Sequence, residues 1–487
     1  MNILEILLQD GCRVANFAAV SREWQPIIEQ HNFARIYLTR SRLENFRETI
    51  HRNRALVHYI WLCVELDEYD CTECGHLNTS TSRSGSKDSI PLTAAFKRLF
   101  ATLSTWEPNG NLLLDISVHS PSDSQHWFKY LTFEPDLPFD ERNQNWCAET
   151  AMLEKLDDHN HDWCAGRRKS PPKRIAIEKV FEGITGGGPF DGEEFYTPVW
   201  RDLPLAPAVT GLLLRQQTRR QWWAKALDQL LSRLPGLQEI HYEPWREWSR
   251  HMQAGADHSF PRLLKWFASS HVRRLVLFEN FDPQYTLRLS ECDPVRIPAP
   301  NVAEAIACAS LALEQLSASF MVDAADFFCA REPSWEWPNL TSMALTTRLL
   351  APDTSANAID GMLLAAAAAA INMPNLKTME LWNAQAGLAM LFRYESTGNG
   401  LPAVLTLRGT WEFELRPRVA QAWEAVARKP RGQGSVIVKE LVGIGVVRWS
   451  HGDAIHHLKL LNPVVRPVSL WQIRMEHRLR DGCTRLE

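Results

Sequence analysis

Apolar residues recur along the chain in short groups that predict a series of β-strands. Each group has apolar residues at a first position and again three and five residues later. Eight groups fit this spacing: Val57, Ile60 and Leu62; Leu113, Ile116 and Val118; Val209, Leu212 and Leu214; Leu237, Ile240 and Tyr242; Val272, Leu275 and Leu277; Leu313, Leu316 and Ala318; Leu340, Met343 and Leu345; and Leu376, Met379 and Leu381. Short apolar runs of this kind are typical of buried strands.

Helical patterns precede several of these groups. Leu227, Leu230, Leu231 and Leu234 fall on one helix face just before Pro235, and the run "MLLAAAAAAI" stands before Pro374. Proline ends a helix because it lacks a backbone N–H. A helix, a stop and a short strand, repeated, is the unit of an α/β solenoid. The alternative is a βαβ sheet protein without repeat symmetry.

Changes in pattern divide the chain into four expected regions. Residues 1–40 form a short helical segment, and residues 41–200 hold early repeats with long polar insertions. Residues 201–410 are expected to form the solenoid, with repeats of irregular length. Residues 411–487 contain the helical pattern "ELRPRVAQAWEAVARK" and the strand-rich "SVIVKELVGIGVVRW". We expect them to cap the array, because an open solenoid end exposes its core.

Composition and charge exclude several classes of function. The formal net charge is −4, which argues against a nucleic-acid partner for the chain as a whole. The longest apolar run, Met362 to Ile371, is too short to span a bilayer, so no membrane partner is expected. Ten scattered cysteines and no signal peptide indicate a cytoplasmic or nuclear protein. The basic stretch "RRKSPPKR" is similar to a nuclear-import signal.

Near the start, "VSREW" followed by "IIEQHNFARIYL" resembles the second half of an F-box. The chain begins with "MNILEILL" where the F-box has a Leu-Pro pair and a carboxylate, so the first helix is expected to be incomplete. The resemblance implies docking on the adaptor subunit of cullin-based ubiquitin ligases. The implied adaptor-binding residues are Ile3, Ile6, Leu7, Val20 and Trp24.

The strand groups resemble the leucine-rich repeat, although only Asn280 matches the repeat's usual asparagine. An F-box followed by such repeats is typical of ligase substrate receptors. Two further segments, "YIWLCVELDEYDC" and "LDISVHSPSDSQHWFKYLTFEPD", are similar to filamentous-fungal proteins of unknown function. We therefore expect a fungal substrate receptor that is not an enzyme, needs no cofactor, binds an adaptor and a protein target, and is a monomer outside that complex. Strand alternation predicts the target-binding residues Glu239, His241, Arg274, Ser342, Thr378 and Glu380.

One group of residues has the spacing of half a zinc site. Cys71 and Cys74 form a CxxC pair, which can hold one tetrahedral ion together with two more ligands. The stretch "HNHDWC" offers His159, His161 and Cys164, and the candidate set is Cys71, Cys74, His159 and Cys164. We favour the alternative, a reduced CxxC at a loop edge beside solvated histidines, and expect no bound metal.

Two polar stretches are interpreted as structural. "SPSDSQHW" favours a turn whose Ser or Asp caps a helix over a catalytic triad. "RQQTRRQWWAKA" favours a helix with Trp in the core and Arg in water over a surface for single-stranded nucleic acid. Two rivals to the ligase receptor stay open: a solenoid scaffold without a ligase link, and a zinc-binding or hydrolytic enzyme.

Overall fold

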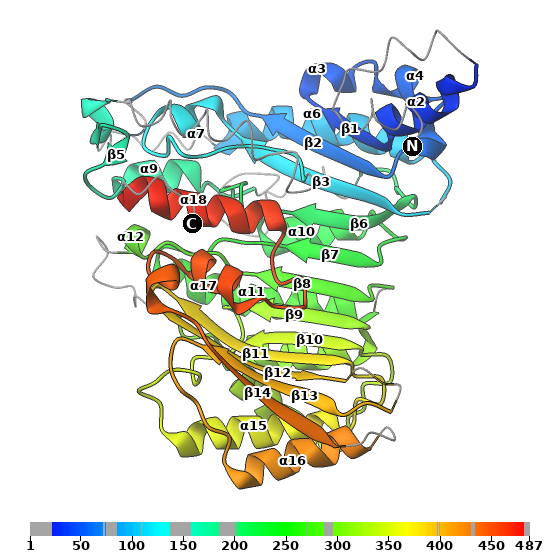
Figure 1. The fold of residues 1–487 in the computed structure, drawn as a ribbon. Coiled ribbons are helices and arrows are strands. Elements are labelled where there is room, and N and C mark those ends of the chain that lie inside the picture. Colours follow the sequence, from blue (N-terminus) through cyan, green and yellow to red (C-terminus); the bar gives the residue numbers. More distant parts are fainter. Residues whose placement is uncertain are drawn as a thin grey trace.

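The computed structural model describes residues 22–71, 74, 85–108, 110–136, 157–184, 200, 202–269, 271–286, 296–396, 398, 400–429 and 434–481. The fold is mixed α/β, built on a large and mostly parallel sheet (Figure 1). Within the described residues this sheet has twelve strands, and their order in space is their order along the chain.

The sheet strands are β1 (Arg35–Leu38), β2 (Tyr59–Glu65), β3 (Leu112–His119), β6 (Val209–Leu214), β7 (Glu239–Tyr242), β8 (Arg274–Phe278), β9 (Gln315–Ser319), β10 (Ser342–Thr346), β11 (Thr378–Gln385), β12 (Leu388–Glu395), β13 (Ala403–Gly409) and β14 (Ser435–Leu441). From β1 to β11 every neighbouring pair is parallel. Strand β12 is antiparallel to both β11 and β13, and β14 is parallel to β13. A separate small ribbon pairs β4 (Trp163–Cys164) with β5 (Arg167–Arg168).

All eight predicted apolar groups reach into strands β2, β3 and β6–β11, and the pairing aligns them. Two apolar rows cross the sheet in register. The first row is Ile60, Leu114, Leu212, Ile240, Leu275, Leu316, Met343 and Met379; the second is Leu62, Ile116, Leu214, Tyr242, Leu277, Ala318, Leu345 and Leu381. The predicted phase is confirmed in seven strands. In β3 it is displaced by two residues, because Leu114 and Ile116, not Ile116 and Val118, pair with Ile60 and Leu62.

Helices cover the face that carries these apolar rows, and together they form the largest core cluster. They are α6 (Gly85–Leu103), α10 (Ala224–Leu231), α11 (Arg250–Ser269), α13 (Pro300–Ala309), α14 (Ala324–Cys329), α15 (Ala356–Ala370) and α16 (Pro417–Arg428), with the 3-10 turn η6 (Ser310–Ala312). Each helix from α10 to α16 contacts the next one in the series. In α10 the predicted face is confirmed, because Leu227, Leu230 and Leu231 are buried.

Short helices surround the first strand and the early insertion. Beside β1 lie α2 (Trp24–Ala34), α3 (Arg40–Leu43), α4 (Phe46–Ile50) and η2 (Arg54–Leu56). The region between β3 and β6 contains α7 (Pro121–Gln125), η4 (His159–His161) and α9 (Arg174–Val180), and α12 (Pro283–Thr286) follows β8. Strand β1 follows α2 directly along the chain.

Residues 442–481, here called the crossing segment, lie on the opposite face of the sheet. They include η7 (Ile444–Val447), α17 (His451–Leu458) and α18 (Pro467–Asp481), drawn in orange and red in front of the strands in Figure 1. Val447, Ile455 and Leu458 pack on Trp382 and Leu391. The predicted cap at 411–487 therefore occupies two places: α16 and β14 lie at the last edge of the sheet, and the crossing segment runs back over its face.

Candidate metal centre and binding surface

Two cysteines and two histidines from separate parts of the chain meet beyond the end of strand β2. Their ligand atoms all lie within 4.8 Å of one another. Cys71 Sγ is 3.6 Å from His161 Nε2 and 3.8 Å from His126 Nε2, and Cys74 Sγ is 3.5 Å from His161 Nε2. Cys74, His126 and His161 are buried, whereas Cys71 reaches solvent. We call these four residues the Cys–His cluster.

Local structure positions the two histidines of the cluster. His126 is the C-cap of α7, a helix that starts with a capping box between Ser120 and Asp123. His161 ends the short turn η4, and its Nδ1 lies 2.7 Å from Asp158 Oδ2. The two imidazole rings stack with 4.9 Å between their centroids. Both Nε2 atoms can therefore face the sulfur atoms at once.

Burial and neighbouring charges shift the pKa values of several groups in and beside the cluster. Burial lowers the pKa of His126, and the neighbouring His161 and Lys129 lower it further. Burial raises the pKa of Asp158, but hydrogen bonds from Lys129 and His161 outweigh this effect and bring the pKa to about 2. Burial and the nearby Cys71 raise the pKa of the Cys74 thiol to about 11. A bound cation would offset this cost of forming a thiolate.

The predicted zinc set is only partly brought together. Cys71 and Cys74 belong to the cluster, but His159 is exposed and Cys164 is half-buried outside it. The sequence reasoning chose the wrong members of "HNHDWC", since His161 is the one that η4 turns inward. The predicted set also lacks His126, because the sequence "SPSDSQHW" indicates only a polar turn at this place. That turn was nevertheless predicted correctly, because Ser120 caps α7.

The predicted target-binding residues lie on the sheet face opposite the helices. Glu239, Arg274, Ser342 and Thr378 form one cross-strand row, in which neighbours pair in register. Gln315 fills the gap in this row and Glu395 extends it, and the sequence reasoning named neither. Every one of these six residues is partly exposed. We call this set the polar row.

The two other predicted residues, His241 and Glu380, lie one row further along and are closed off from solvent. His241 is 2% exposed and Glu380 is 0% exposed. His241 Nε2 lies 2.7 Å from Glu239 Oε1, while the Glu380 carboxylate accepts hydrogen bonds from the backbone of Leu461 and Asn462 in the crossing segment. The expectation that these two side chains stand open to a partner is therefore wrong.

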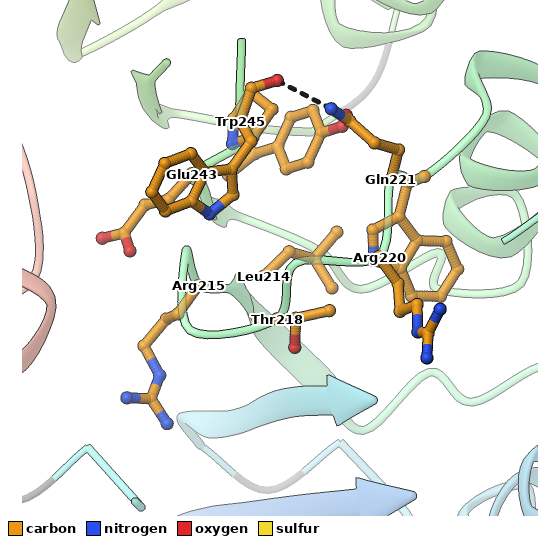
Figure 2. A pocket seen from close by; sticks show the side chains of 10 residues that line it. Leu214, Arg215, Thr218, Arg220, Gln221, Glu243 and Trp245 are labelled. Atoms are coloured by element: carbon orange, nitrogen blue, oxygen red, sulfur yellow. Dashed lines mark hydrogen bonds between the residues drawn. The ribbon is translucent and has the colours of Figure 1, made fainter. Parts of the chain in front are cut away.

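The turn after β6 holds buried arginines, contrary to the predicted helix with arginines in water. Figure 2 shows Arg215 and Arg220 leaving this turn in different directions beside Trp245. Arg215 is 1% exposed and its Nη2 lies 2.7 Å from Asp115 Oδ2, while Arg220 pairs with Asp123. The turn also contacts the crossing segment, because Arg219 forms an ion pair with Glu476 of α18. Buried charges need such partners, so these arginines are structural.

The pocket beside this turn is small. Leu214, Tyr242 and Trp245 are among its lining residues, and Gln221 Nε2 donates a hydrogen bond of 3.0 Å to the carbonyl of Trp245 across it (Figure 2). Its interior of about 10 Å³ has room for about one water molecule. This pocket does not suit an organic substrate.

At the first edge of the sheet, α2 carries one of the predicted adaptor-binding residues. Trp24 is partly exposed at the start of this helix, Ile28 is buried, and Ile27 is 45% exposed. The other predicted residues, Ile3, Ile6, Leu7 and Val20, lie outside the described residues. The basic stretch at 167–174 is only partly solvated, since Arg168 is buried and bonds Tyr130 and Gln284.

Comparison with known proteins finds a match in the second half of the chain. The sequence model of a family of unknown function, DUF6546, matches residues 267–466, which is less than half of the chain. The match runs from the end of α11 through the sheet strands β8–β14 and into the crossing segment. No curated protein matches the chain. Within the described residues, no helix is both long enough and apolar enough to cross a membrane.

Proposed function

We propose that this chain is a leucine-rich-repeat-like solenoid that binds another protein, most concretely as a substrate receptor of a cullin-type ubiquitin ligase. The solenoid reading is supported by the two in-register apolar rows and by the succession of strands and helices in chain order. Solenoids of this kind present an extended strand face to their partners.

The observation that carries the binding function is the polar row. Its six members span β7 to β12 and remain partly exposed, although the crossing segment covers the next row on the same face. Arg274 Nη2 lies 2.6 Å from Glu239 Oε2, so the first two members are already oriented. A row of mixed polar groups on a rigid sheet suits a polar protein surface, because side chains held in place lose little entropy on binding.

The ligase link rests on the F-box resemblance and on α2. Trp24 and Ile27 leave apolar surface at the edge of the molecule where an adaptor would dock, and large aromatic side chains often dominate such contacts. Trp24 is the first residue of the helix. An aspartate there is favourable for a helix N-terminus, so Trp24→Asp changes the surface and keeps the helix.

The test is co-expression of the full chain with the ligase adaptor subunit, followed by co-purification. Gln30→Asp is the matched control, because it puts the same residue on an exposed position of the same helix. A second version carries a Leu-Pro-containing half-helix before Met1, which gives the chain the pattern with which an F-box begins. Binding that Trp24→Asp abolishes and Gln30→Asp retains supports the ligase receptor. Loss of binding in all versions favours the scaffold without a ligase link.

A further inference from the structure

We propose that Cys71, Cys74, His126 and His161 bind one zinc ion in a closed structural site. Two thiolates and two imidazoles are a common ligand set for structural zinc. The four ligand atoms come from the residues after β2, from the end of α7 and from η4.

The distances between the ligand atoms fit a single tetrahedral ion. Zinc binds sulfur at about 2.3 Å and nitrogen at about 2.0–2.1 Å, which places a sulfur and a nitrogen of one tetrahedron about 3.6 Å apart. Three of the four sulfur–nitrogen distances in the cluster are 3.5, 3.6 and 3.8 Å, and all four ligand atoms lie within 4.8 Å of one another. The side chains are thus already spaced as ligands, and binding requires little rearrangement.

Asp158 supplies the second sphere that a zinc-binding histidine normally has. Its Oδ2 accepts from His161 Nδ1 at 2.7 Å, which leaves Nε2 of that ring as the free, metal-facing nitrogen. Lys129 Nζ lies 2.8 Å from the same Oδ2 and holds the carboxylate in place. Asp158 is therefore a positioning residue, since it acts on the metal through His161.

Two other chemistries of a CxxC pair fit the cluster less well. A mixed two-iron cluster holds its cysteines on one iron and its histidines on the other. Here both sulfurs lie within 3.6 Å of the same histidine nitrogen, which favours a single shared ion. A Cys71–Cys74 disulfide would leave two inward-facing imidazole nitrogens without a role.

The ion would join the early insertion to the sheet. Cys74 belongs to a second apolar cluster with Trp127, Trp163 and Phe181, which surrounds the region between β3 and β6. Zinc at this place would tie η4 and α7 to the end of β2 and keep that aromatic cluster assembled. With four protein ligands the tetrahedron has no open position for water, so the site would be structural and not catalytic.

The experiment measures zinc in the purified full-length chain by plasma mass spectrometry, after dialysis against metal-free buffer. We expect one zinc per chain, retained in His159→Asn and Cys164→Ser, and lost in Cys74→Ser and His161→Asn. The two controls come from the same "HNHDWC" stretch but lie outside the cluster. Cobalt exchanged into the unmodified chain is expected to give the absorption of a tetrahedral site with thiolate ligands, which needs no variant that could misfold.

Three results would overturn the proposal. The first is a chain without bound zinc that also gives no tetrahedral cobalt spectrum. The second is equal loss of zinc in the two control variants and the two ligand variants. The third is a Cys71–Cys74 disulfide, found by mass spectrometry, in protein purified in the presence of zinc. None of these measurements depends on adaptor binding, so the zinc site and the ligase link are tested independently.

Discussion

Asn462 donates both its backbone N–H and its side-chain amide to the buried carboxylate of Glu380, at 2.9 and 2.7 Å. The contact joins the crossing segment to strand β11 across 82 residues of sequence. Leu461 donates its backbone N–H to the other carboxylate oxygen at 2.9 Å. One glutamate therefore accepts hydrogen bonds from two successive residues, Leu461 and Asn462, which lie between α17 and α18.

We expect Glu380→Ala to destabilise the protein by about 2–4 kcal/mol, because it leaves buried donors without an acceptor. The loss should concentrate in the crossing segment, so limited proteolysis should cut between α17 and α18 before the sheet. Glu395→Ala, at a partly exposed position of the neighbouring strand, is the control and should have little effect. Equal sensitivity of the two variants would contradict this role of Glu380.

Glu247 gives the stability an unusual dependence on pH. Burial, together with the carboxylates of Glu279 and Asp257, raises its pKa to about 7 from a usual value of 4.5. Between these two pH values the unfolded chain loses a proton that the folded chain keeps, so the stability contributed by this group falls as pH rises. Above pH 7 Glu247 is ionised in the folded chain as well, and the loss of stability has reached its full size.

Glu247→Gln should remove this cost. The variant should be more stable than the unmodified protein by about 2–3 kcal/mol near pH 8, with a difference close to zero near pH 5. Urea unfolding at the two pH values measures it, with the exposed Glu304→Gln on α13 as control. A gain of the same size at both pH values would show that the charge of Glu247 is not its cause.

Two glycines should respond to alanine in opposite directions. A Cβ at Gly236, in the turn before β7, would lie 2.2 Å from the backbone carbonyl oxygen of Pro207, whereas a Cβ at Gly361 in α15 meets nothing within 4 Å. We expect Gly236→Ala to cost about 1–3 kcal/mol through overpacking. Gly361→Ala should add about 0.5–1 kcal/mol through helix propensity. Thermal unfolding of the pair checks the sign of each change.

Much of the sheet could be predicted because the signal is local. A strand buried under helices repeats its apolar residues at short spacings, and each group carries that signal by itself. The phase of β3 failed because the residue three positions before Leu114 is Asn111, so the apolar spacing fits only a group that starts at Leu113. A shift of two residues also keeps the same side chains on the same face, so alternation alone does not reveal it.

We did not predict from the sequence that the crossing segment covers the sheet face opposite the helices, although the apolar residues of β11 and β12 indicate it. Trp382 and Ala384 in β11, and Ala389 and Leu391 in β12, are apolar on the side away from the helices. Strands that are apolar on both faces indicate a sheet covered on both faces. In the metal centre, the CxxC pair could be recognised from the sequence. His126 could not, because it belongs to a different strand–helix unit, and no spacing rule connects ligands that come together only in the folded sheet.

Cysteine reactivity provides a direct readout of the metal centre. Cys308 and Cys329 are exposed and should react first with iodoacetamide, whereas burial raises the pKa of Cys63 to about 12 and should protect it. Cys71 is exposed as well, yet a bound zinc should keep it unreactive until a chelator removes the ion. Peptide mass spectrometry after a short pulse resolves the four sites. Labelling of Cys71 as fast as Cys308 in zinc-loaded protein would contradict the metal site.

The carboxylate beside His161 should tune metal affinity. We expect Asp158→Asn to weaken zinc binding by about 10–100-fold, since it removes the charge that orients the imidazole. Competition with a chromophoric chelator measures the affinity, and the neighbouring exposed Asp157→Asn is the matched control. An unchanged affinity in Asp158→Asn would mean that His161 is held by its packing alone.

The crossing segment also sets an order of events during synthesis. Residues 442–481 leave the ribosome after all strands of the sheet, and chains fold largely from the N-terminus as they emerge. Until then Phe278, Trp382 and Leu391 have no cover from that segment. A pause in translation shortly before residue 442 would therefore prolong the life of a nascent chain with an open apolar face, which is the kind of surface that chaperones bind.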